Sequence, residues 1–182
     1  MEPRLGVVLH DGDAGVEALL SAFVGSLRAD GADVGGLLQR TGRQPNGRPR
    51  MELVDIRHGG VFLISQDLGR DSTACCVDPS GVAAAALVLK RELAAPPALL
   101  VVNKFAGLEA KGGGLLAELF EAVAGGVPVL TSLARRHQPA WEAAVQGAGT
   151  VLPPDAAALL AWWRSITGGA TSAPDAPSPP PY

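Results

Sequence analysis

The stretch that decides the fold is Arg4–Gln39, with the sequence RLGVVLHDGDAGVEALLSAFVGSLRADGADVGGLLQ. Leu5–Leu9 is an apolar run typical of a buried strand, and Val34–Leu38 is a second one. Between them the glycine-containing turn His10–Gly15 leads into Val16–Arg28, where apolar residues recur at helical spacing. A strand, a turn and a helix in this order bring backbone N–H groups together at the helix N-terminus, which is a geometry for binding an oxyanion.

The rest of the chain continues this alternation of strands and helices. The polar segment Arg40–Arg50 predicts a loop, and the runs Met51–Ile56 and Val61–Ile64 around a Gly59-Gly60 turn predict a hairpin. Further strands are expected at Ala98–Val102, Val127–Leu130 and Thr150–Leu152. Helices are expected at Pro79–Leu93 with Asp78 as N-cap, and at Leu115–Ala124, Trp141–Gln146 and Asp155–Ile166. The pattern predicts an α/β fold with a mostly parallel sheet flanked by helices and one inserted β-hairpin.

Length and composition indicate one domain, residues 1–166, followed by a disordered Pro-, Ala- and Ser-rich tail from Thr167 to Tyr182. The net charge of −3 argues against a nucleic-acid partner. No apolar run reaches the roughly 20 residues of a membrane span, and Met1–Arg4 does not begin a signal peptide, so we expect no membrane partner and a cytoplasmic location. Helices rich in Ala and Gly permit a homo-oligomer without requiring one.

The turn after the first strand lacks the side chains of a working phosphate loop. With Gly12 as the first glycine of the motif, Ala18 and Leu19 take the places of the lysine and the hydroxyl; with Gly15 as the second glycine, Val16 and Glu17 do. Two interpretations stay open. The turn binds nothing, or it binds an anion through the backbone of the residues Gly12, Asp13, Ala14 and Gly15.

Other loops that follow strands carry further candidates, because ligands of open α/β sheets bind beyond the carboxyl ends of the strands. Asn103-Lys104 stands where a Walker-type ATPase carries a metal-binding acid. Neither residue supplies that charge, so Lys104 either meets an anion or is solvated. The compact basic run of Arg135, Arg136 and His137 is either a solvated loop or a cationic wall of the same site.

The polar loop Gln66–Val77 contains one cation, two hydroxyls and two thiols. Arg70, Ser72 and Thr73 are suited to holding a tetrahedral oxyanion by hydrogen bonds. Cys75 and Cys76 are candidate metal ligands, although small buried cysteines are commoner and adjacent cysteines form no zinc signature.

Several stretches together resemble a known family. They are Gly31–Gln39, Ser65–Gly69, Cys76–Pro79, Val102–Phe105, Glu109–Leu115 and Gly126–Thr131. The chain resembles THEP1-type P-loop nucleoside triphosphatases, and more closely the bacterial DUF2478 family, which looks like such an enzyme with a degenerate P-loop. The resemblance covers Leu5 to Trp163 and implies a P-loop NTPase-like, three-layer fold.

The resemblance also implies a ligand, because the family is associated with molybdenum uptake and molybdenum-enzyme gene clusters. Molybdate or tungstate is therefore the candidate ligand. In the family a Gly-Arg-Gly stretch precedes the helix that begins near Leu115, whereas this chain has Gly113 in place of the arginine. If that arginine contacts a ligand, this chain has one cation fewer at its site.

Three hypotheses follow. The leading one is a non-catalytic, degenerate P-loop protein that binds a small inorganic oxyanion, without a certain cofactor, in molybdenum storage, handling or regulation. The second is a nucleotide-binding protein or NTPase with an atypical phosphate loop, in which Lys104 or Arg135 replaces the missing lysine. The third is an interaction or assembly module without a small ligand.

Overall fold

The computed structural model describes residues 4–66 and 77–168, except for the side chains of Asp13 and Ala14. Its core is one seven-stranded sheet in the order β4-β3-β2-β5-β6-β1-β7. The strands are β1 (Leu5–His10), β2 (Val34–Arg43), β3 (Pro49–Asp55), β4 (Val61–Leu63), β5 (Leu99–Val102), β6 (Val129–Ala134) and β7 (Thr150–Leu152). Strands β2, β5, β6, β1 and β7 are parallel, and only the pairs that join β3 to β2 and to β4 are antiparallel. The predicted mostly parallel sheet with an inserted hairpin is confirmed.

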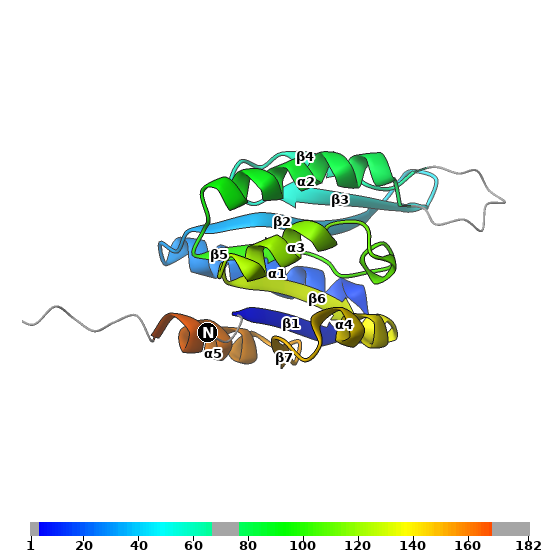
Figure 1. Cartoon of the computed structure of the whole chain (residues 1–182). Coiled ribbons are helices and arrows are strands. Elements are labelled where there is room, and N and C mark those ends of the chain that lie inside the picture. Colours follow the sequence, from blue (N-terminus) through cyan, green and yellow to red (C-terminus); the bar gives the residue numbers. More distant parts are fainter. Residues whose placement is uncertain (1–3, 67–76, 169–182) are drawn as a thin grey trace, which may run out of the picture.

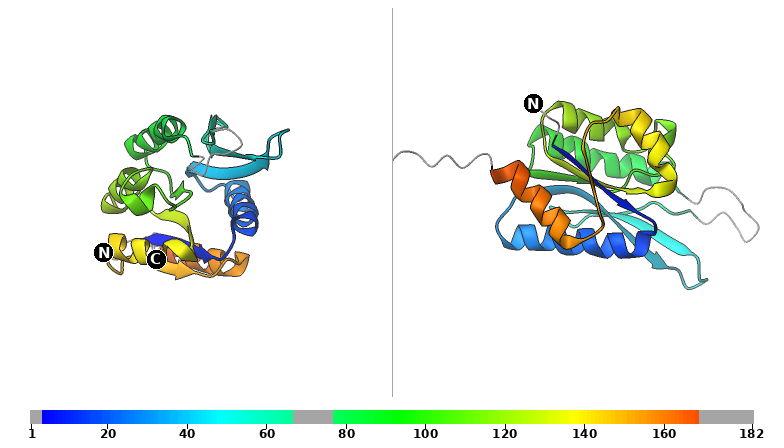
Figure 2. Two further views of the ribbon diagram at one scale, coloured as in Figure 1. Left: turned by 90° about the vertical axis from the view of Figure 1, so that its right-hand side faces the viewer. Right: turned by 90° about the horizontal axis from the view of Figure 1, so that it is seen from below.

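Helices cover both faces of the sheet and complete three layers (Figures 1 and 2). The helices are α1 (Asp13–Ala29) and α5 (Ala156–Thr167) on one face, and α2 (Pro79–Ala94), α3 (Leu116–Ala124) and α4 (Gln138–Val145) on the other. Strand side chains alternate between these layers. Val101 and Leu130 belong to the core under α1, while Val102 and Val129 belong to the core under α2 and α3.

Predicted helix ends agree with the structure where capping residues mark them. The side chain of Asp78 accepts a hydrogen bond of 2.9 Å from the amide of Ser80, and Pro79 is the first residue of α2. Asp155 caps α5 in the same way. That last helix includes Thr167, which the sequence analysis placed in the tail; residues 169–182 of that tail lie outside the described residues.

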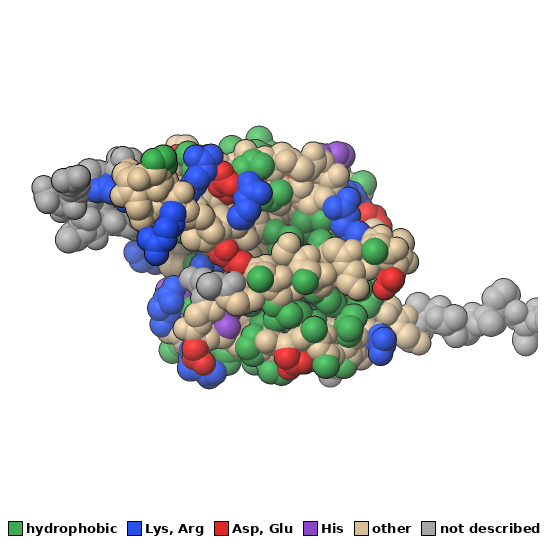
Figure 3. Space-filling view, turned by 180° about the vertical axis from the view of Figure 1, so that it is seen from behind, with side chains coloured by type: hydrophobic (Ala, Val, Ile, Leu, Met, Phe, Trp, Pro, Cys, Tyr) green, Lys and Arg blue, Asp and Glu red, His purple; other side chains and the backbone are tan. Residues whose placement is uncertain are grey.

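The prediction of a loop over Arg40–Arg50 is wrong, because β2 and β3 continue through most of it as a long antiparallel pair. Its polar side chains hide the strands from a hydrophobic pattern, but they make specific contacts. Glu52 forms ion pairs with Arg40 at 2.6 Å and with Arg50 at 2.7 Å. In the space-filling view of Figure 3, Lys and Arg side chains gather over this upper part of the molecule.

The strand predicted at Val127–Leu130 is longer than expected. β6 runs from Val129 to Ala134 and so extends beyond the predicted end at Leu130, and Thr131 and Ser132 are fully buried in the sheet. Their polar side chains gave no sign of this burial. The following helix α4 also begins earlier than predicted, at Gln138.

The structure explains why two adjacent positions near the start of β2 require glycine. Gly36 has φ +104°, and a Cβ there would lie 2.1 Å from the carbonyl oxygen of Val101 on β5. A Cβ on Gly35 would lie 2.4 Å from the Oε2 atom of Glu92, which is fully buried. This part of the Gly31–Gln39 stretch, which carries the family resemblance, is therefore explained by packing.

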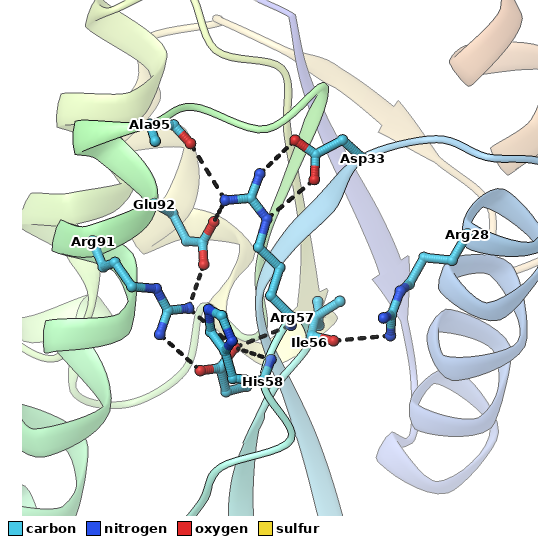
Figure 4. Close-up of polar contacts among 9 residues, drawn as sticks. Arg28, Asp33, Ile56, Arg57, His58, Arg91, Glu92 and Ala95 are labelled. Atoms are coloured by element: carbon cyan, nitrogen blue, oxygen red, sulfur yellow. Dashed lines mark hydrogen bonds and ion pairs between the residues drawn. The ribbon is translucent and has the colours of Figure 1, made fainter.

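The carboxylate of Glu92 belongs to a charge network at the amino edge of the sheet, the edge at which the parallel strands begin (Figure 4). Arg57, in the β3–β4 turn, lies 2.7 Å from Glu92 and 2.5 Å from Asp33. Arg91 contacts Glu92 and pairs with Asp55 at 3.0 Å. The network joins the hairpin turn to the end of α2 and to the start of β2.

Candidate functional site

The candidate residues lie at the carboxyl edge of the sheet, where β1, β5 and β6 end. The prediction that polar loops follow these ends is confirmed for three of them, at residues 11–12, 103–115 and 135–137. The fourth predicted loop contains Arg70, Ser72, Thr73, Cys75 and Cys76, and all five lie outside the described residues.

The connection between β1 and α1 consists of two residues, Asp11 and Gly12. Gly12 is extended, with φ −155° and ψ 145°, and caps α1 without a side-chain hydrogen bond. Asp13, Ala14 and Gly15 already belong to the first turn of the helix. A phosphate loop has four residues between its two glycines. A two-residue connection is too short to surround a polyphosphate, although the first N–H groups of a helix have no partner within it.

The first of the three predicted basic residues lies beside this connection. The Nε atom of Arg135 donates a 2.8 Å hydrogen bond to Asp11, across 124 residues of sequence. Both side chains are largely exposed, at 58% for Arg135 and 78% for Asp11. An exposed pair of this kind contributes about 0–1 kcal/mol to stability, and here it places a carboxylate next to the N-terminus of α1. Because this carboxylate repels anions, the N-terminus of α1 is an unfavourable position for an anionic ligand.

A pocket of about 330 Å³ opens at the same edge, on the side of the sheet that α2 and α3 cover. Four predicted site residues line it, namely Asn103, Lys104, Arg136 and His137. The other lining residues are Gln39, Met51, Leu53, Ile64, Val77, Val82, Ala106, Gly107, Leu108, Glu109, Lys111 and Leu115. Neither Arg135 nor any residue of the turn Gly12–Gly15 lines this pocket.

One wall of the pocket is the loop between β5 and α3, and Glu109 holds it in shape. The carboxylate of Glu109 accepts hydrogen bonds of 3.0 Å from the amides of Ala106 and Leu115, one on each oxygen. The glycines Gly112 and Gly114 turn the chain with φ values of +84° and +61°. The loop around Glu109–Leu115 is therefore stabilised by its own hydrogen bonds, and its only carboxylate accepts them from backbone amides.

Asn103 is the most deeply buried of the predicted site residues, at 1% exposure. Its Oδ1 accepts a 2.5 Å hydrogen bond from the hydroxyl of Ser132 on the neighbouring strand β6. Its Nδ2 is buried and has no hydrogen-bond partner among the described residues. A buried donor without a partner costs about 1–3 kcal/mol, so this amide is a candidate for contact with a water or a ligand.

Sequence reasoning missed three polar residues of the pocket, which are Gln39, Glu109 and Lys111. Gln39 lies on β2 and also donates a 3.2 Å hydrogen bond to Glu17 of α1; it directly follows the predicted strand Val34–Leu38 and was not weighed as a site residue. Lys111 lies in the short 3₁₀ helix Glu109–Lys111. The sequence could have indicated Lys111 as a site residue, because it stands in a glycine-rich loop after a central strand.

The described residues contain no group of three or more His, Cys, Asp or Glu side chains placed to hold a metal ion. None of the helices within residues 4–66 and 77–168 has both the length and the apolar character needed to cross a bilayer.

Comparison with solved structures supports the fold. The chain is similar to a protein whose title reads "Solution Structure of a Human Cancer-Related Nucleoside Triphosphatase", with a TM-score of 0.58 and 15% identity. The superposition covers 96% of this chain and 100% of the human protein. At this identity the likeness shows a shared P-loop NTPase-like architecture.

Comparison with curated proteins finds a relative in Bradyrhizobium diazoefficiens, named molybdenum import ATP-binding protein ModC 2. The two are 34% identical over 165 residues, which cover 90% of this chain and 18% of the relative. The chain thus spans less than a fifth of the length of that protein.

The sequence pattern of one protein family matches residues 5–162, from the first strand to the last helix. The match includes every described residue of the pocket and both edges of the sheet. This chain belongs to the DUF2478 family, a family of proteins of unknown function.

Proposed function

We propose that this protein binds an oxyanion at the carboxyl edge of its sheet without hydrolysing a nucleotide, with molybdate or tungstate as the first candidates. Its role would be cytoplasmic storage, handling or regulation of molybdenum. The observation that carries the proposal is the convergence of Asn103, Lys104, Arg136 and His137 on one pocket.

The charge of the pocket supports an anionic ligand. Among the described residues, Lys104, Lys111 and Arg136 line it together with a single carboxylate, that of Glu109, in a chain whose net charge is −3. The carboxylate of Glu109 accepts backbone N–H groups on both oxygens, whereas Arg136 is exposed and forms no ion pair with a described residue. Cations gathered at a concave site raise the local concentration of anions.

The choice of molybdate or tungstate draws on the relatives. The curated relative is named for molybdenum import, and the chain matches only part of it. The name of that relative also mentions ATP binding, which keeps a nucleotide as the competing ligand. Against a nucleotide stand the two-residue β1–α1 connection and Asn103 at the place of a metal-binding acid.

Thermal denaturation with added ligands tests the proposal. The purified protein is melted with molybdate, tungstate, phosphate, sulfate, ATP and GTP, each with and without Mg²⁺. A ligand that binds only the folded state adds about 2.7 kcal/mol of stability at a hundredfold excess over its Kd. We expect molybdate or tungstate to raise the Tm in a magnesium-independent manner.

The variant Arg136→Ala removes one pocket cation and is expected to reduce this rise. The matched control is Lys90→Ala, which removes an exposed cation of α2 that does not line the pocket. A magnesium-dependent rise with a nucleotide, accompanied by its hydrolysis, would replace the proposal with an NTPase. No rise with any of the six ligands would favour an interaction module.

A further inference from the structure

We infer that the pocket takes an amphiphilic anion, meaning an organic molecule with one anionic group and an apolar body, and that bare oxyanions occupy only its charged end. This inference rests on the proposed function, because it concerns the same pocket. It adds the chemical class of the natural ligand.

The polarity of the pocket changes along the order of the strands. Lys104 and Arg136 follow β5 and β6, on one side of the pocket. Across β2, the lining residues are apolar: Met51 and Leu53 on β3, Ile64 directly after β4, Val77 shortly before α2, and Val82 within α2. A hydrated oxyanion gains nothing from such a wall, whereas an apolar group is stabilised by leaving water.

The apolar wall is an outer surface of the main hydrophobic core. Leu53, Ile64 and Val82 are buried core residues, and Met51 and Val77 are half-buried against the same cluster. A site for a small inorganic ion alone would need only polar contacts near the cations. Met51 and Val77 keep part of their apolar surface accessible beside the pocket, and an apolar group of a ligand that covers this surface is stabilised by leaving water.

Size points to the same conclusion. The cavity volume of about 330 Å³ falls within the range of about 300–1,000 Å³ that is typical of sites for organic ligands. One water molecule takes up about 30 Å³ of liquid, so a five-atom oxyanion fills a small part of the pocket. The remainder holds either water against apolar walls or the body of a larger ligand.

A series of phosphate esters with the same anionic head tests the inference. The probes are inorganic phosphate, methyl phosphate, phenyl phosphate and 1-naphthyl phosphate, and their Kd values are measured by calorimetry on the full chain. We expect affinity to rise stepwise with the apolar body, by about tenfold for each roughly 60 Å² of apolar area that the pocket buries.

Variants separate the two ends of the pocket. Met51→Gln keeps the length of a half-buried side chain and makes it polar, so it should remove most of the gain from the aryl group and leave the Kd of phosphate unchanged. Val77→Thr is a milder, isosteric second variant. Leu87→Gln, at an exposed position of α2 outside the pocket, is the control. Arg136→Ala should weaken all four probes by a similar factor.

The outcomes distinguish the inference from the proposed function. A stepwise rise that Met51→Gln abolishes supports the inference. Equal Kd values for all four esters, or a rise that Met51→Gln and Val77→Thr leave intact, overturn the inference and leave the anion site standing. If neither the phosphates nor molybdate and tungstate bind, the proposed function fails, and the inference fails with it.

Discussion

The two edges of the sheet use their charged residues differently. At the amino edge the carboxylates of Asp33, Asp55 and Glu92 pair with the guanidinium groups of Arg57 and Arg91 (Figure 4). At the carboxyl edge, cations line a cavity where the one carboxylate contributed by the described residues, that of Glu109, accepts hydrogen bonds from backbone amides. The comparison indicates that charge at the amino edge stabilises the fold, while Arg136 at the carboxyl edge lies exposed beside the pocket and pairs with no carboxylate of the described residues.

Glu92→Gln tests the stabilising role of the amino edge and is expected to have the largest effect on the free energy of unfolding. Glu92 is fully buried between Arg57 and Arg91, and removing one partner of a buried ion pair costs about 3–5 kcal/mol. Arg91 is 42% exposed, so we expect the lower end, about 3 kcal/mol, in the free energy of unfolding measured with urea. Glu121→Gln on the exposed side of α3 should change it by less than about 0.5 kcal/mol. Equal effects of the two variants would contradict a stabilising amino edge.

A pair of glycine substitutions should give effects of opposite sign. Gly35→Ala places a Cβ 2.4 Å from the Glu92 carboxylate and should destabilise the protein by about 2 kcal/mol. Gly25→Ala, in α1, meets no atom within 4 Å and should stabilise it by about 0.5–1 kcal/mol. Chemical denaturation measures both. A neutral Gly35→Ala would show that Glu92 moves aside without cost.

The pH dependence of stability tests the amino edge in another way. Burial raises the pKa of Asp55, but hydrogen bonds from Arg91 and from the amides of His58 and Arg57 outweigh it and hold the pKa below its ordinary value of 3.8. A lowered folded-state pKa adds stability that is present above the unfolded pKa and is lost as the pH falls through the folded pKa. Stability should therefore fall below about pH 4.

The matched variant for this measurement is Asp55→Asn. It should lower stability at pH 7 by about 1–2 kcal/mol, because a hydrogen bond to a charged group is lost, and it should flatten the acid slope. The control is Asp30→Asn at the exposed end of α1. Wild-type and Asp55→Asn curves that stay parallel down to pH 2 would assign the acid transition to other groups.

The smallest expected effect concerns the carboxyl edge. Gly113→Arg restores the arginine that the family resemblance implies, and the structure has room for it, since the atom nearest to an added Cβ is the oxygen of Leu108 at 3.6 Å. An additional exposed cation should tighten anion binding by about 0.5–1 kcal/mol, or roughly two- to fivefold. The Kd of phosphate or molybdate measures it. Gly107→Arg is a comparison, because Gly107 lines the pocket on the same loop.

Strands with buried apolar side chains could be predicted from the sequence, whereas strands with polar side chains could not. The central strand β5 is buried on both faces, so its unbroken apolar run Leu99–Val102 was sufficient. The β2–β3 pair beyond Gln39 has polar side chains on both faces, and period-two hydrophobicity cannot detect such strands. The burial of Thr131 and Ser132 was not predicted for a different reason. The buried hydroxyl of Ser132 donates a hydrogen bond to Asn103, which is 29 residues away in the sequence, and a local sequence pattern does not reveal such a partner.

The candidate site was also predicted only in part. Lys104 and Arg136 were predicted because a general rule places ligands beyond the carboxyl ends of parallel strands. The apolar wall was not predicted, because Met51 and Leu53 lie on a strand whose pairing with β2 the sequence pattern did not indicate. Gly35 belongs to a stretch that carries the family resemblance, and only the position of Glu92 reveals that its role is packing.

The direction of the last helix has a practical consequence. β1 begins at the amino edge, and α5 returns to it, because Trp162 near its end packs against Gly6 near the start of β1. Residues 4 and 168 therefore both face away from the pocket, as Figures 1 and 2 show for α5 and the N-terminal strand. An affinity tag, a fluorescent protein or a surface tether joined at either end of this segment would leave the pocket open to solvent. The proposed anion binding can thus be measured on the immobilised domain without redesigning it.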